Sequence, residues 1–257
     1  MKKMIYQKTI ELTNGPVTSA LFKHFSRSKS SRWIIPNYIK TYKIETGDVT
    51  EQISAFPTLH DFFTRKLSPE SRPLAETPVT MPVDGKIEIF GDLYEGVNFL
   101  VKNQQYSLAD LLGNSDLADH FSNGKYAVLY LSPADYHRIH SPVDGKVVNQ
   151  YVQGKKSYPV NRSGLMYGKS PISGNYRMIT ELETAFGRML LVKVGAMFVN
   201  SIELTNLSEH WHKGEEVGYF SFGSTVVLFF EKDQIEFCEG LRDGQPVKMG
   251  EALANML

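Results

Sequence analysis

A long apolar run near the C-terminus constrains the fold most. Residues 218–230 read GYFSFGSTVVLFF, and the β-branched and aromatic residues on both sides of Gly223 and Ser224 are typical of buried strands. Gly223 interrupts the run, although a glycine weakens a strand because it has no side chain to pack. A β-bulge or a tight turn explains this interruption without any chemistry. The alternative hypothesis is that the Ser224 hydroxyl attacks the peptide bond that precedes it.

Short strands with glycine or proline at nearly every junction follow one another after residue 78. A helix is predicted over 59–67, before this region, and another over 108–112 within it. The pattern predicts an α+β fold, a mainly antiparallel β-sandwich or barrel-like body with an N-terminal helical segment. Residues 1–78 are the predicted helical segment and 79–257 the predicted catalytic domain. The predicted strands are 86–90, 126–131, 145–152, 189–194, 198–204 and 225–231.

The charge of the chain is distributed unevenly. Its 257 residues contain 28 Lys and Arg and 28 Asp and Glu, but residues 1–43 carry nine basic side chains and a single acid, Glu11. An amphipathic helix is predicted after Asn14-Gly15-Pro16, and aromatic residues continue among the bases up to Tyr42. This composition favours binding to an anionic membrane interface, and a helical pair packed on the body with a solvated basic face is the alternative. Nucleic acid is not expected as a partner, because the rest of the chain is acidic.

Composition also limits the cellular setting. The single cysteine, Cys238, excludes an intrachain disulfide framework and favours a reducing compartment. No apolar run approaches the roughly 20 residues that a membrane-spanning helix needs. We therefore expect a protein that is cytoplasmic and either soluble or peripheral to the membrane.

One turn sequence occurs twice. Residues 81–87 read MPVDGKI and residues 141–147 read SPVDGKV, so each is a proline-started turn that leads into a strand. The two copies could form equivalent corners of a pseudo-symmetric β-fold. In that case Asp84 or Asp144 could be functional while the other is a turn residue.

The densest polar cluster is 131–142, LSPADYHRIHSP, with His137 and His140 three residues apart. Imidazoles exchange protons near neutral pH, so acid–base chemistry suits this pair. The alternative is that His137 or His140 is an ordinary surface histidine or a histidine with satisfied hydrogen bonds and no role in chemistry. A metal site with His210 and His212 is not favoured, because no HExxH motif or cysteine pair accompanies them.

Ser224 lacks the G-x-S-x-G elbow of hydrolases, which favours a scissile bond within the chain itself. Attack on the Gly223 carbonyl would convert the amide into an ester, and elimination would then leave dehydroalanine, which hydrolyses to a ketone. The product would be a pyruvoyl group at position 224. Such a carbonyl can form a Schiff base with an amine and act as an electron sink.

Separated motifs in this order resemble the phosphatidylserine decarboxylase family, of the prokaryotic, pyruvoyl-dependent type. The motifs are FFTR at 62–65 with Arg72-Pro73, PVDG at 82–85, YSL at 106–108 with LLG at 111–113, DYHRIH at 135–140, VGA at 194–196, GEEVGYF at 214–220 and FGST at 222–225. The resemblance implies a proenzyme that cleaves itself between Gly223 and Ser224. The products would be a β chain of residues 1–223 and an α chain of residues 224–257, held together as a heterodimer.

The same resemblance implies roles for individual residues. Asp84, His140 and Ser224 would form the charge-relay set for cleavage, Ser224 would become the covalent pyruvoyl cofactor, and His137 would assist decarboxylation. Asp144 would be structural. No metal ion is expected. Phosphatidylserine would lose CO2 to give phosphatidylethanolamine at the cytoplasmic side of the cell membrane. The sequence leaves open whether the heterodimer of the β and α chains dimerises further.

Two departures from the family pattern leave the shape of the substrate pocket open. Asn103 stands where a glycine is expected, and residues 197–201, MFVNS, differ from the small, glycine-bearing version that is common. A decarboxylase for a related serine-headed lipid is one alternative. A non-catalytic membrane-binding β-domain, or a serine hydrolase that uses Ser224 and His140, are the others.

Overall fold

The structure is a computed structural model, and it describes residues 21, 23–94, 96–101, 104–154, 158, 170–195, 202–221 and 224–257. The predicted helix start at Asn14, the departures at Asn103 and 197–201, and Gly223 lie outside these residues. Within them, every strand pairing is antiparallel, which confirms the predicted fold class.

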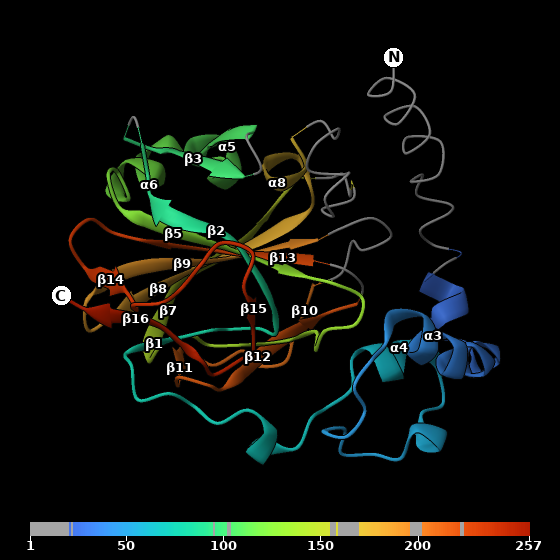
Figure 1. Cartoon of the computed structure of the whole chain (residues 1–257). Helices are drawn as coiled ribbons and strands as arrows, with labels where there is room; N and C mark the ends of the chain where they lie inside the picture. The colour runs from blue at the N-terminus through green and yellow to red at the C-terminus, as the bar shows by residue number, and fades with distance from the viewer. Residues whose placement is uncertain are drawn as a thin grey trace.

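An eight-stranded sheet forms the centre of the molecule (Figure 1). Five of the predicted strands lie in it within a few residues of their expected bounds. Its strands, in spatial order, are β11 (His210–Trp211), β7 (Gly145–Gln153), β8 (Arg177–Thr184), β9 (Gly187–Gly195), β13 (Ser224–Phe230), β5 (Lys125–Leu131), β2 (Gly85–Asp92) and β15 (Pro246–Val247). β8 was not predicted, because its RMITELET sequence mixes charged and apolar residues, yet six of its eight residues are buried.

Three smaller sheets accompany the large one. The predicted strand 198–204 is described only as β10, and the strand before Gly223 is β12. The sheets are β10 (Ile202–Leu204), β12 (Glu216–Phe220) and β6 (Arg138–His140); β1 (Val79–Thr80), β16 (Ala252–Met256) and β14 (Ile235–Phe237); and β3 (Asn98–Val101) with β4 (Gln104–Ser107).

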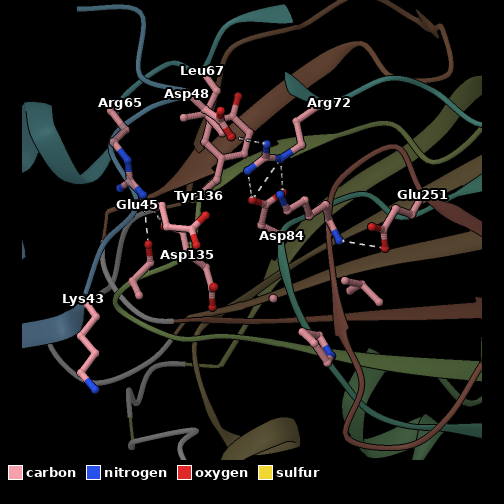
Figure 2. A pocket seen from close by; sticks show the side chains of 15 residues that line it. Lys43, Glu45, Asp48, Arg65, Leu67, Arg72, Asp84, Asp135, Tyr136 and Glu251 are labelled. Atoms are coloured by element: carbon pink, nitrogen blue, oxygen red, sulfur yellow. Dashed lines mark hydrogen bonds and ion pairs between the residues drawn. The ribbon is translucent and has the colours of Figure 1, made fainter. Parts of the chain in front are cut away.

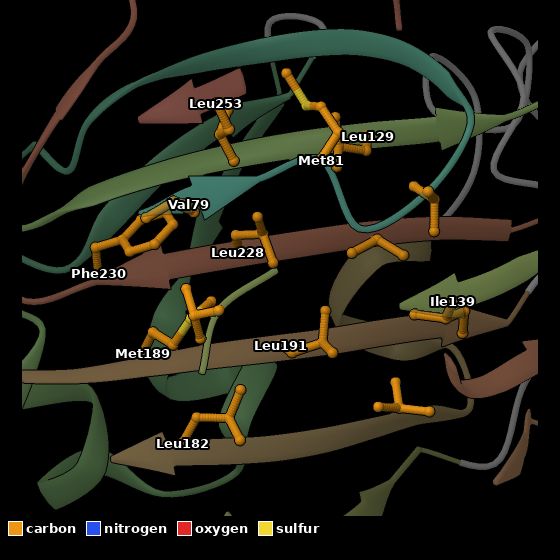
Figure 3. Packing of buried hydrophobic residues seen from close by; sticks show 14 of the residues in the cluster. Val79, Met81, Leu129, Ile139, Leu182, Met189, Leu191, Leu228, Phe230 and Leu253 are labelled. Atoms are coloured by element: carbon orange, nitrogen blue, oxygen red, sulfur yellow. The ribbon is translucent and has the colours of Figure 1, made fainter. Parts of the chain in front are cut away.

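Both faces of the large sheet are buried along its central strands, β9, β13 and β5. Along β13, Val226, Leu228 and Phe230 point into one apolar core, which they share with residues of β1, β6, β12 and β16 (Figure 3). Val227 and Phe229 point into a second core beneath α5 (Leu108–Leu112), α6 (Ser115–His120) and α8 (Pro171–Gly174). A strand that is covered on both sides reads as a continuous apolar run, which explains the sequence of β13. The predicted helix 108–112 is confirmed in full.

The described part of the N-terminal segment is helical, as predicted, and lies beside the sheets at lower right in Figure 1. Ile35, Phe56, Leu59 and Phe62 form a small apolar core of their own. The segment contains η1 (Lys29–Ile34), α3 (Ile35–Tyr42), η2 (Ile53–Ala55), α4 (Leu59–Phe63) and η3 (Pro69–Ser71). No described helix is long and apolar enough to cross a bilayer.

The prediction of one helix over 59–67 was wrong in its length, because α4 ends at Phe63. Beyond that point the chain turns to pair with the preceding loop: Leu67 bridges Val49, and the Ser68 amide donates to the Asp48 carbonyl at 2.8 Å. These tertiary hydrogen bonds replace the helical ones. The division of the chain at residue 78 stays a prediction.

Candidate active site

The chain crosses from one sheet to another between Phe220 and Ser224. β12 ends at Phe220 in the three-stranded sheet, and β13 begins at Ser224 in the centre of the large sheet. Ser224 pairs with Leu131 of β5 on one side and with Gly195 of β9 on the other. Gly223 itself is not among the described residues. The sequence thus marked a real strand boundary.

Ser224 is fully buried, with 0% of its surface exposed. Its Oγ has no hydrogen-bond partner among the described residues. A buried hydroxyl without a partner destabilises a fold by about 1 to 3 kcal/mol, so such groups are few and usually have a reason. A hydroxyl that is kept for reaction is one such reason.

A second crossing runs beside the first. The loop from Leu131 to His137 joins β5 to β6, which belong to the same two sheets. Its end at Leu131 is opposite Ser224, and its other end is tied to β12 because the Phe220 amide donates to the His137 carbonyl at 3.0 Å. The fold therefore brings the 131–142 cluster to the crossing that contains the predicted cleavage site.

His137 is also fully buried. Its Nδ1 lies 2.8 Å from the Asp135 carbonyl, and its ring packs on Phe63 with the centroids 4.0 Å apart. A carbonyl only accepts, so Nδ1 carries the proton and Nε2 carries the lone pair. Burial, together with the nearby charge of Arg65, lowers the pKa of His137 to about 3. Nε2 has no partner in the described part of the chain.

His140 has the same tautomer. Its Nδ1 donates to the Gly214 carbonyl at 2.8 Å, so its Nε2 accepts from the Tyr136 hydroxyl at 3.1 Å. Burial is the main cause that lowers the pKa of His140. The ring is therefore a neutral base whose lone pair is occupied by Tyr136.

Asp84 is buried and fully hydrogen-bonded. Arg72 donates to its carboxylate from Nε at 2.8 Å and from Nη2 at 2.5 Å, and the Met249 amide adds a bond at 2.9 Å. Asp84, Arg72 and Tyr136 line one cavity of about 410 Å³ (Figure 2). Asp84 is thus hydrogen-bonded to Arg72, and His140 is hydrogen-bonded to Tyr136. The charge-relay set of Asp84, His140 and Ser224 stays a prediction.

The second copy of the turn has a different environment. Asp144 is exposed, and it accepts hydrogen bonds from His212 at 3.4 Å and from the Lys213 amide at 3.1 Å on the surface. His210 and His212 are exposed as well. The described residues contain no cluster of histidine, cysteine or acidic side chains suited to a metal ion.

Sequence reasoning gave no role to Arg65, Arg72 or Tyr136. All three lie within motifs that carry the family resemblance, which was the available signal. Their roles depend on partners that are distant along the chain, such as Asp84 for Arg72 and Ala134 for Arg65.

The fold and the site define a class of protein: an enzyme on a mainly β scaffold, with a buried serine hydroxyl and two neutral histidines near one sheet crossing. The chain matches the phosphatidylserine decarboxylase family over residues 59–255. It is 46% identical, over 259 aligned residues, to the phosphatidylserine decarboxylase proenzymes of Bacillus thuringiensis subsp. konkukian strain 97-27 and Bacillus cereus strain 03BB102. Each alignment covers 100% of this chain and 99% of the relative. The chain belongs to the phosphatidylserine decarboxylase family.

Proposed function

We propose that this chain is a proenzyme that cleaves itself between Gly223 and Ser224 and then decarboxylates phosphatidylserine to phosphatidylethanolamine. The observation that carries the proposal is Ser224: a buried hydroxyl without a partner among the described residues, at the first position of β13. The relatives named as proenzymes support a processing step.

Water is the only added reagent that the proposed cleavage consumes. The Ser224 Oγ attacks the Gly223 carbonyl, so that an ester replaces the amide. Loss of the Ser224 α-proton and departure of the Gly223 carboxylate leave dehydroalanine at position 224. Water then replaces the nitrogen, which leaves as ammonia, and the pyruvoyl carbonyl remains.

His140 is the proposed base for this step. Its Nε2 carries the lone pair, and it becomes available to the Ser224 proton when the Tyr136 hydroxyl releases its hydrogen bond. Asp84, held by Arg72 and the Met249 amide, supplies a buried negative charge near His140, which favours the protonated ring.

A pyruvoyl group at position 224 would supply an electrophilic carbonyl that could hold the substrate amine and act as an electron sink for the loss of CO2. His137 is proposed to hold the proton that the decarboxylated carbon then receives. The orphaned Nε2 is the atom that would carry it. Because burial lowers the pKa of His137, its Nε2 is unprotonated at rest, and a proton that it takes up during turnover is readily passed on.

The two product chains are expected to stay together. β13, the first strand of the predicted α chain, lies between β9 and β5 of the predicted β chain. Two hydrogen-bond ladders and two apolar cores therefore hold residues 224–257 after cleavage.

The enzyme is proposed to act at the cytoplasmic side of the cell membrane. Trp33 exposes 86% of its surface, and Ile34 and Tyr42 are also exposed. Lys29 and Arg32 lie beside Trp33 around one hollow of this segment. Exposed aromatics among cations suit anionic headgroups, and a substrate with two acyl chains stays in the bilayer.

Denaturing mass spectrometry tests the proposal. Wild-type protein should give two chains that separate between residues 223 and 224, with a pyruvoyl mass at the new N-terminus. Ser224→Ala should give one intact, inactive chain, while the matched variant Ser221→Ala should be cleaved. An intact chain from active wild-type enzyme refutes the proposal. A membrane-binding domain also predicts an intact chain, and a serine hydrolase predicts an intact chain that a serine-directed phosphonate labels.

A further inference from the structure

Arg65 carries a buried positive charge that no described carboxylate pairs with in a salt bridge. Only 4% of the residue is exposed, yet Arg65 forms no salt bridge with any described carboxylate. Its Nη2 donates to the Ala134 carbonyl at 3.0 Å, while Nε and Nη1 have no acceptor among the described residues. The ring of Phe62 lies beneath the guanidinium, 5.2 Å from Cζ.

The acids near Arg65 are already engaged. Asp84 is paired with Arg72, and the Asp135 carboxylate accepts from the Ser132 amide at 2.6 Å. Burial is the main cause that lowers the pKa of Arg65, because removal from water destabilises the charged guanidinium. A buried charge without an ion-pair partner is unfavourable, so an anionic ligand bound to Arg65 would stabilise this site.

The position of this charge relates it to the proposed chemistry. Arg65 lines the cavity of about 410 Å³ together with Tyr136 and Asp84 (Figure 2). Arg65 Nη2 and His137 Nδ1 share one acceptor, the Asp135 carbonyl, at 3.4 Å and 2.8 Å. The guanidinium is therefore a close neighbour of the imidazole that is proposed to serve the reacting carbon.

We propose that Arg65 binds the phosphodiester of the substrate headgroup. This inference rests on the proposed function. In a serine-headed phospholipid, one methylene and one oxygen separate the phosphorus atom from the carbon that loses CO2. A headgroup whose reacting carbon lies at His137 thus brings its phosphodiester near Arg65.

The substrate carboxylate is the weaker candidate for this charge. It loses its negative charge as CO2 forms, so an arginine bound to it would stabilise the ground state more than the transition state. The phosphodiester keeps its charge throughout and gains binding without that penalty. Among the other acids that line the cavity, Asp48 pairs with Arg72 and Glu251 accepts from the Lys248 amide. Glu45 also lines the cavity, and it forms no salt bridge with Arg65 among the described residues.

Binding can be tested apart from catalysis in the Ser224→Ala precursor, which cannot form the pyruvoyl group. The probe is glycerophosphoethanolamine, the product headgroup without acyl chains, followed by calorimetric titration or ³¹P NMR. Arg65→Gln should weaken its binding at least about tenfold, because a charged hydrogen bond is lost. The matched variant Lys248→Gln removes an exposed cation from the same cavity and should change binding less than about threefold.

Three outcomes overturn the inference: equal binding in Arg65→Gln and the parent, an equal loss in Lys248→Gln, or binding of ethanolamine as tight as that of the phosphodiester. If Arg65→Gln does not fold, Arg65→Met, which keeps the length of the side chain and removes its charge, decides in the same assay, and unchanged binding in it refutes the role. In processed enzyme, Arg65→Gln should raise KM about tenfold while kcat stays within about threefold. The mass spectrum of this variant should still contain both chains. If the variant is cleaved and its KM is unchanged, the binding role of Arg65 is refuted while the proposed function stands.

Discussion

Lys193 offers a sharp test of the energetics of this fold. It lies on β9 and is fully buried, with its Nζ 2.7 Å from the Thr180 hydroxyl and 5.5 Å from the centre of the Trp211 ring. No described carboxylate pairs with it. Burial lowers the pKa of Lys193 from its ordinary 10.5 to about 7. We therefore predict that Lys193→Met stabilises the protein at neutral pH.

The sign follows from proton linkage. The unfolded chain keeps the ordinary pKa of lysine, so between pH 7 and pH 10.5 it binds a proton that the folded chain has mostly released. The free energy of unfolding therefore rises with pH across this window, by up to about 1.4 kcal/mol per pH unit and about 5 kcal/mol in all. Below the folded pKa both states are protonated and the dependence ends.

Methionine has a similar length and no charge, so Lys193→Met removes this dependence. It also loses the hydrogen bond to Thr180, worth about 1 kcal/mol. The variant should be more stable than the parent by about 3 kcal/mol at pH 7, and the difference should approach zero near pH 10.

Urea unfolding at pH 7, 8, 9 and 10 measures this difference, with the Ser224→Ala precursor as parent so that one chain unfolds. The matched control is Lys146→Met, which removes an exposed lysine of β7 and should stay within about 0.5 kcal/mol of the parent at every pH. A stability difference for Lys193→Met that is constant from pH 7 to pH 10 would refute the reasoning, as would a variant less stable than the parent at pH 7.

Three further predictions follow from single contacts. In Gly85→Ala the new Cβ would lie 2.4 Å from the Tyr130 carbonyl oxygen, so β2 must shift, and we expect the free energy of unfolding in urea to fall by about 2 kcal/mol or more. The control Gly47→Ala, whose Cβ would meet no atom within 4 Å, should change little, and an equal effect of the two substitutions would contradict this prediction. Trp33→Ser should weaken sedimentation with anionic vesicles about tenfold without affecting cleavage, whereas unchanged sedimentation means that this exposed ring lies away from the bilayer. His137→Ala should be cleaved normally but lose about 100-fold or more in decarboxylation, measured as CO2 release, and normal turnover excludes the proposed proton transfer.

The prediction of strands was right where apolar side chains in the sequence are also the buried ones in the structure. β13 and β5 are apolar along their length because both of their faces are covered, so their sequences alone identified them. β8 was missed because its buried charged residues have partners on other elements: Glu181 pairs with Arg188 of β9, and Arg177 donates to the Leu111 carbonyl of α5. α4 was predicted too long because the pairing of Leu67 with Val49 is a tertiary contact.

The sequence by itself determined the fold class, the family resemblance and the position of the interruption at Gly223 and Ser224, because these depend on local residue type and order. The tertiary structure decided what surrounds them. In the tertiary structure Ser224 is buried where the chain passes from one sheet to another. Asp84 forms a salt bridge with Arg72, His140 is hydrogen-bonded to Tyr136, and Arg65 has no salt bridge with a described carboxylate. Such partners lie far apart along the chain, and only packing brings their atoms to hydrogen-bond distance.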